Sequence, residues 1–240
     1  MTLRWLICFS ALGGSFLPAA NVGGRIELRD SKDPAVSRKK DYSGVVVWLE
    51  RIDKTAASSA KPAPVRGRIL QKDKTFSPHV LIVPTGSIVD FPNLDPVFHN
   101  AFSNYDGQVF DIGLYQPGGT RSVRFARPGI VRIFCNIHSS MTAVVAVVDS
   151  AWFDTTKADG RFELRDVAPG EYQLKVFHER ATAASLNAAQ RPVLVTAQTA
   201  ALPSITISES GYLSIPRKDK FGRDYKAVPE DSGIYPVTRK

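Results

Sequence analysis

The sequence predicts an all-β protein. Apolar residues show almost no helical periodicity, whereas short runs of β-branched and aromatic residues alternate with turns that contain glycine and proline. Short strands at this spacing are typical of sandwiches and barrels. With 240 residues, 43% of them hydrophobic, the chain is long enough to bury one or two ordinary cores.

Residues 1–20 have the features of a secretory signal peptide. One positive charge, Arg4, precedes an apolar run from Trp5 to Leu17, and the residues of 18–20 supply a cleavage site. The run is too short to span a bilayer, although it would act as an anchor if it were not cleaved. A lipoprotein signal at Cys8 is disfavoured by the bulky residue before it. We therefore expect an exported protein that is not integral to the membrane once the signal is removed.

Residues 21–150 are expected to form the first folded domain. A turn signal at 127–129 predicts that the strand Val131–Cys135 folds back on the strand Arg121–Phe125. The strand Ala143–Val148 is uniformly apolar, so we expect the core of its own sandwich to cover one face and the next domain to cover the other. A stretch rich in Lys, Ala, Ser and Pro, 53–65, is predicted to be a mobile surface loop. The seven candidate strands are Gly24–Leu28, Gly44–Leu49, Val80–Val83, Ser87–Phe91, Arg121–Phe125, Val131–Cys135 and Ala143–Val148.

The β pattern restarts after Asp149. Turn signals at Asp159-Gly160 and Pro169-Gly170 separate runs in which apolar and polar residues alternate. These runs predict a small second β-domain over 151–208, with strands at Arg161–Leu164, Tyr172–Val176, Val193–Val195 and Ile205–Ile207. Beyond it the chain is polar and basic, so 209–240 is expected to be an extended tail that is either flexible or packed as an arm.

One seven-residue run carries the most specific chemistry. It begins at Cys135, continues through His138 and ends at Met141, and a second histidine, His99, lies upstream. Without the signal peptide, Cys135 is the one cysteine left, in a compartment where thiols normally pair. Coordination to a metal would explain it, since a thiolate, two imidazoles and a thioether select copper and describe a blue electron-transfer site. Taken alone, Cys135 would be read as a small buried hydrophobe.

Two other chemistries fit the same residues less well. Zinc binds Cys and His, but structural zinc sites favour a fourth Cys, His or carboxylate over Met141. A nucleophilic Cys135–His138 pair is possible in principle, but no motif supplies an oxyanion hole. Of the remaining histidines, we expect His79 at the surface and His178 in a structural contact with Glu179 or at the domain interface.

The ligand run resembles the copper loop of cupredoxins. The spacing Cys135-x-x-His138-x-x-Met141 is similar to the short loop of amicyanin, and 89–100 resembles the cupredoxin segment that carries the first histidine. The resemblance covers roughly residues 76–149. It implies a Greek-key sandwich that holds one copper ion, with His99, Cys135 and His138 in the trigonal plane and Met141 as the axial ligand.

The same resemblance assigns a role to Asn100, which matches an asparagine that ties the two ligand-bearing loops together in cupredoxins. We expect Asn100 to donate a hydrogen bond that fixes the loop or touches the thiolate. Each ligand histidine also needs a partner for its other ring nitrogen.

The second domain resembles another family. Residues 159–162 and 169–172 resemble carboxypeptidase regulatory-like (transthyretin-like) domains, which are small Ig/transthyretin-like β-sandwiches. The order of the two domains resembles bacterial periplasmic proteins often labelled methylamine-utilisation or plastocyanin-like. A periplasmic location is the expectation that follows.

These observations favour a non-enzymatic carrier of single electrons. Multicopper oxidases and copper nitrite reductases bind catalytic copper with additional histidines, often in His-x-His pairs, whereas this chain has four histidines and no such pair. The alternative is a copper-handling or scaffold protein whose β-sandwich domain mediates recognition.

The expected partners are redox proteins with acidic surfaces. The formal net charge is +8, which would steer acidic partners toward the chain. Docking is expected where the His138 ring nears the surface, framed by Ile137, Ser139 and Ser140, in weak encounters of small area. Nucleic acid is not an expected partner, because no long Lys/Arg run or stacking motif is present.

Overall fold

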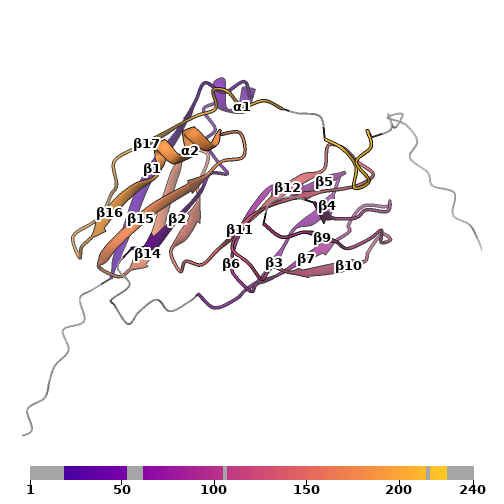
Figure 1. Ribbon diagram of the computed structural model, residues 1–240, viewed down its shortest axis with the longest axis horizontal. Coiled ribbons are helices and arrows are strands. Elements are labelled where there is room, and N and C mark those ends of the chain that lie inside the picture. The colour runs from indigo at the N-terminus through magenta and orange to yellow at the C-terminus, as the bar shows by residue number, and fades with distance from the viewer. Residues whose placement is uncertain (1–18, 53–61, 105–106, 215–216, 226–240) are drawn as a thin grey trace, which may run out of the picture.

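The computed structural model describes residues 19–52, 62–104, 107–214 and 217–225. Two β-sandwiches lie next to each other along the longest axis (Figure 1). We call the one built from residues 66–148 the central sandwich. The other, built from residues 20–51 and 153–208, is the flanking sandwich. Strands dominate both, so the predicted all-β class is confirmed.

The central sandwich contains a three-stranded sheet, a five-stranded sheet and a small hairpin around one apolar core. Its strands are β3 (Arg66–Arg68), β4 (Leu70–Lys72), β5 (Thr75–Ser77), β6 (Val80–Pro84), β7 (Ile88–Pro92), β8 (Phe102–Ser103), β9 (Phe110–Asp111), β10 (Thr120–Arg124), β11 (Gly129–Phe134) and β12 (Thr142–Val148). The sheet orders are β10-β7-β3 and β6-β12-β11-β8-β9, and β4 pairs with β5. Parallel pairs β6–β12 and β3–β7 show that crossovers connect the sheets.

The flanking sandwich contains a three-stranded and a four-stranded sheet. Its elements are β1 (Ala20–Arg29), α1 (Pro34–Ser37), β2 (Val46–Arg51), β13 (Phe153–Thr155), β14 (Arg161–Val167), β15 (Gly170–Phe177), α2 (Ala183–Ala189), β16 (Arg191–Val195) and β17 (Ile205–Ser208). The orders are β14-β1-β17 and β13-β2-β15-β16, and the two sheets enclose a separate apolar core.

The placement of β1 and β2 corrects the predicted domain that began at residue 21. β1 pairs with β14, with Val22 opposite Leu164, and β2 pairs with β13 and β15. Val22 and Ile26 are fully buried in the core that the C-terminal strands supply. Residues 20–51 therefore belong with 153–208, because the apolar face of β1 is complementary to strands more than a hundred residues away.

The turn at 127–129 also differs from the prediction. β10 does not pair with β11: it pairs with β7, while β11 pairs with β12 and β8 in the other sheet. Backbone hydrogen bonds join Phe125 to Gly86 and Ser87. They hold the end of β10 beside β7, so the turn carries the chain from one sheet to the other.

The uniformly apolar strand β12 is covered on both faces, as predicted. Ala143, Val145 and Val147 lie in the core of the central sandwich. Val144 and Ala146 point the other way and pack with Val46 and Phe177 of the flanking sandwich in a third apolar cluster. This cluster joins the two sandwiches through the strand that follows the ligand run.

An ion pair lies at the same junction. His79 Nδ1 donates to the carbonyl of Thr142 (3.0 Å), and His79 Nε2 lies 2.9 Å from the carboxylate of Glu179. The predicted surface position of His79 is thus a half-exposed bridge between the sandwiches. His178, predicted to contact Glu179, is buried and instead pairs with Glu209 (2.9 Å).

The predicted signal peptide and most of the predicted loop at 53–65 lie outside the described residues. Among the residues that are described, neither helix has the length or the hydropathy to cross a bilayer. The regulatory-like family of the second domain stays a prediction.

We expect the His79–Glu179 pair to stabilise the fold more at low pH than at high pH. The hydrogen bond to Glu179 raises the pKa of His79 above its ordinary value of 6.5, so its stabilisation is complete below that value and is lost as the pH rises through the folded-state pKa. The difference in unfolding temperature between the wild type and His79→Gln should therefore shrink from about pH 6 to about pH 9. A difference that stays constant over this range would contradict the assignment.

Candidate metal centre

The ligand run is a tight loop between two paired strands. β11 ends at Phe134, Cys135 follows directly, and Met141 immediately precedes β12. The amide of Cys135 donates to the carbonyl of Met141 (3.3 Å), and the amide of Met141 donates to the carbonyl of His138 (3.1 Å). Because β11 and β12 are antiparallel neighbours, the loop returns His138 and Met141 to the position of Cys135.

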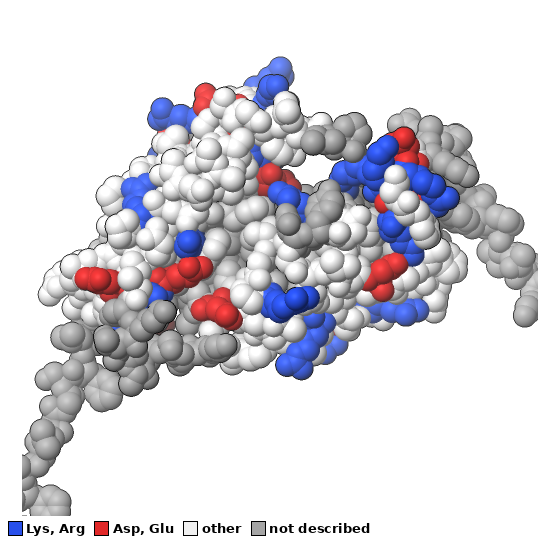
Figure 2. All heavy atoms as spheres, in the orientation of Figure 1, with Lys and Arg blue, Asp and Glu red and all other residues white. Residues whose placement is uncertain are grey.

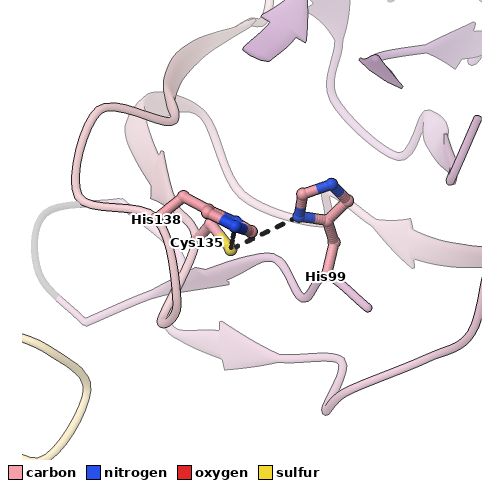
Figure 3. Close-up of side chains that lie close together, drawn as sticks. All are labelled: His99, Cys135 and His138. Carbon is pink, nitrogen blue, oxygen red and sulfur yellow. Dashed lines mark hydrogen bonds between the residues drawn. The ribbon is translucent and has the colours of Figure 1, made fainter. Parts of the chain in front are cut away.

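A second segment brings His99 to the same place. His99 lies in a bridge with Tyr115, in which each residue donates its amide to the carbonyl of the other (3.3 and 3.0 Å). Both residues are buried. Two chain segments that are 36 positions apart therefore meet at one point of the central sandwich (Figure 3).

The sulfur and the two rings form a compact triad. Cys135 Sγ lies 3.9 Å from His99 Nδ1 and 3.8 Å from His138 Nδ1. The three candidate ligand atoms lie within 4.8 Å of one another, as a shared metal ion requires. Cys135 and His99 are fully buried, whereas the His138 ring is partly exposed. Met141 is also fully buried and packs in the same cluster as Cys135.

Asp95 fixes the orientation of the His99 ring. Its carboxylate lies 2.7 Å from His99 Nε2, and it also accepts hydrogen bonds from the amides of Asp73 (2.6 Å) and Lys74 (2.9 Å). With Nε2 held by a buried carboxylate, Nδ1 is left to face the thiolate. Asp95 was missed at the sequence level, although an acidic residue four positions before a ligand histidine was the available signal.

Hydrogen bonds favour the thiolate form of Cys135. Burial opposes ionisation, but the rings of His138 and His99 and the backbone amides of Asn100 and His138 outweigh it and lower the pKa of Cys135 to about 5. Burial likewise opposes the charged form of His99, yet the thiolate and Asp95 raise the pKa of His99. In the metal-free site the sulfur therefore favours its negative form, and the thiolate and Asp95 both favour protonation of the His99 ring.

Asn100 joins the two ligand-bearing segments. Its Oδ1 accepts a hydrogen bond from the amide of Asn136 (2.6 Å), so the side chain accepts at the loop where the sequence predicted that it donates. Its Nδ2 donates to Asp111 (3.4 Å). The side chain of Asn136 in turn accepts from the amide of Lys220 (2.9 Å), a contact that sequence reasoning did not find.

The residues predicted to frame a docking surface differ in their exposure. Ser139 and Ser140 are exposed beside the His138 ring, whereas Ile137 is half-buried against the core of the central sandwich. Phe98, next to His99, is 43% exposed. The partly exposed edge of the metal centre thus has both polar and apolar neighbours.

No family model matches the chain, and no curated protein matches it. Solved structures similar to the chain include a purple cupredoxin from Nitrosopumilus maritimus, with 24% identity, a TM-score of 0.31 and coverage of 34% of this chain and 99% of that one. The Cu(I) form of a single-residue mutant of amicyanin matches with 15% identity, a TM-score of 0.33 and coverage of 42% and 98%. A copper-containing nitrite reductase from Thermus scotoductus matches with 22% identity, a TM-score of 0.33 and coverage of 51% and 28%.

The structural neighbours are copper proteins. At these TM-scores the likeness carries no argument about this chain, and the functional assignment rests on the triad itself.

In the metal-free chain without residues 1–20, we expect the thiol of Cys135 to titrate with a pKa of about 5, well below its ordinary value of 9.0. His138→Gln should raise this pKa, because one of the two rings that stabilise the thiolate is lost. The ultraviolet absorbance of the thiolate against pH measures both values, with Cys135→Ala as the blank. Ionisation of the wild type in the range of a free cysteine would contradict the geometry.

Proposed function

We propose that this protein is an exported, periplasmic type 1 copper protein that carries single electrons between redox partners. The observation that carries the proposal is the buried sulfur of Cys135 with the Nδ1 atoms of His99 and His138 turned toward it. A thiolate, two imidazoles and a weak thioether are the donors of blue copper sites. Among the described residues, the group of possible metal ligands holds no carboxylate and no third imidazole, either of which would favour zinc, and the carboxylate of Asp95 contacts the far nitrogen of His99.

The donor set suits a copper ion, which when bound would supply the Cu(I)/Cu(II) couple. The chain's part is to keep its ligands still. Asp95 holds the His99 ring, Asn100 holds the backbone at Asn136, and buried apolar residues surround Cys135. Ligands that do not move between oxidation states keep the rearrangement that accompanies electron transfer small.

His138 provides the route to the surface. Its ring is the partly exposed member of the triad, and Ser139 and Ser140 beside it are exposed. A partner that docks at this edge would approach the centre through one imidazole. We propose the same edge, with Ile137, as the docking surface.

Charge near this edge favours an acidic partner. Lys and Arg side chains gather over the C-terminal segment at the end of the molecule that carries the central sandwich (Figure 2). The described part of that segment carries Arg217, Lys218, Lys220 and Arg223 against Asp219 and Asp224, so it is net positive although three of the four cations pair with carboxylates. Positive charge beside an electron-transfer edge speeds the encounter with a negatively charged protein.

We infer that the protein is a carrier and not an enzyme. His79 and His178, the histidines outside the triad, are paired with Glu179 and Glu209. They lie at the junction and in the flanking sandwich, and the described residues contain no second group of three or more possible metal ligands. The lack of a second ligand group among these residues supports a carrier over a copper enzyme.

The direct test is the visible and EPR spectrum of the mature chain with one equivalent of Cu(II). We expect an intense visible band from thiolate-to-copper charge transfer and a narrow copper hyperfine splitting, and Cys135→Ala should lose the band. A colourless or ordinary tetragonal spectrum of the wild type would overturn the electron-transfer proposal and favour copper handling. A band that persists in Cys135→Ala would overturn the site.

Met141→Leu tests the axial position. The thioether is a weak axial ligand whose identity tunes the reduction potential, so the variant should keep its copper and its intense band while its reduction potential shifts. Voltammetry of the wild type and the variant measures the change. Complete loss of copper binding by Met141→Leu would show that Met141 is a structural core residue or a primary ligand.

A further inference from the structure

The C-terminal segment 217–225, which we call the strap, lies against the ligand loop. Tyr225 Oη donates to the carbonyl of Cys135 (2.8 Å), and the amide of Lys220 donates to the side-chain oxygen of Asn136 (2.9 Å). Arg217 donates to the carbonyl of Ser139. The strap is the yellow end of the described chain in Figure 1. Three polar groups of one short loop are thus bonded by residues about eighty positions further along the chain.

The strap is also tied to the segment that carries His99. Lys220 Nζ lies 2.6 Å from Asp111, which accepts a hydrogen bond from Asn100 Nδ2 (3.4 Å). Asn100 Oδ1 accepts the amide of Asn136, whose side chain accepts the amide of Lys220. These four residues form a closed ring of hydrogen bonds, which links the strap to both ligand-bearing segments.

The strap has a fold of its own. Asp219 is 9% exposed, and its carboxylate accepts the amides of Phe221 (2.9 Å) and Arg223 (2.8 Å). The amide of Asp219 donates to the carbonyl of Arg223 (2.8 Å). Lys218 pairs with Asp224 across the same turn (2.5 Å). A folded turn presents Lys220 and Tyr225 to the loop in fixed positions, unlike a tail that is held by a single contact.

The loop needs such external support. It supplies three of the four proposed ligands, and its internal backbone hydrogen bonds are the two that join Cys135, His138 and Met141. The strap contacts the loop at its first residue, Cys135, and again at Ser139. The Arg217 guanidinium also lies 5.0 Å from the centre of the Phe134 ring, the last residue of β11.

We propose that the strap is an intramolecular clamp that positions the ligand loop and slows the release of copper, with Tyr225 and Lys220 as its positioning residues. This inference rests on the proposed function for the identity of the metal. The clamp acts on the backbone that carries Cys135 and His138, and no strap residue enters the triad. Its loss should therefore loosen the site without removing a ligand.

The test uses the full mature chain and two single variants of it. Tyr225→Phe removes one hydroxyl, and Lys220→Met removes one ion pair. Transfer of Cu(I) to an excess of a soluble Cu(I) chelator should be roughly two- to tenfold faster in each single variant, the change expected from one lost hydrogen bond. Each variant should keep its intense Cu(II) band, because all four ligands remain.

Matched controls exclude general effects. Tyr212→Phe removes a hydroxyl from the same C-terminal region, where none of the described bonds uses it, and Lys175→Met removes a lysine that pairs with Glu50 on the flanking sandwich (3.8 Å). Both should release Cu(I) at the wild-type rate. If Tyr225→Phe and Lys220→Met release Cu(I) at the same rate as these controls, the clamp proposal is wrong.

Hydrogen exchange of the metal-free chain separates the clamp from the proposed function. The amides of 136–140 should exchange faster in the two strap variants than in the controls, whether or not the chain binds copper. A wild type without the copper spectrum overturns the function, and the exchange rates then decide the clamp alone. Unchanged exchange in the strap variants, with a normal copper spectrum in the wild type, overturns the clamp alone.

Discussion

A charged sulfur in an apolar core is costly unless hydrogen-bond donors and positive groups surround it. Cys135 is such a sulfur, and much of the central sandwich is arranged around it. The two rings face it, backbone amides of both ligand-bearing segments donate to it, and Asp95 holds the His99 ring in place. The same contacts that compensate the burial also fix the directions of the ligand atoms. The contacts that stabilise the thiolate are therefore the same contacts that order the metal centre.

β12 carries this order into the rest of the molecule. It begins one residue after Met141, and its alternate side chains pack in two different cores. The carbonyl of its first residue, Thr142, accepts the hydrogen bond of His79, whose other nitrogen faces the flanking sandwich. The flanking sandwich therefore supports the metal centre from behind, on the face of the sheet opposite the triad.

The sequence predicted what depends on local pattern. Strands with strong alternation, the double cover of Ala143–Val148 and the spacing of the ligand run all follow from neighbouring residues. The pairing of strands that are far apart in the sequence could not be predicted in this way: nothing near Val22 indicates that it lies opposite Leu164. Nor does local composition reveal that Tyr225 bonds to Cys135, because one hydrogen bond between distant residues leaves no periodic signal.

The two-part construction of the flanking sandwich sets an order of folding. Every strand partner within the central sandwich lies between residues 66 and 148, whereas β1 and β2 must wait for strands beyond residue 152. As the chain emerges, the sheets of the central sandwich can close while β1 and β2 still have unpaired edges. The N-terminal strands are thus synthesised first, but they must wait for later strands before their edges are paired. A chaperone that binds exposed strand edges would find its target there, when the four proposed ligands are already folded but the strap has not yet been made.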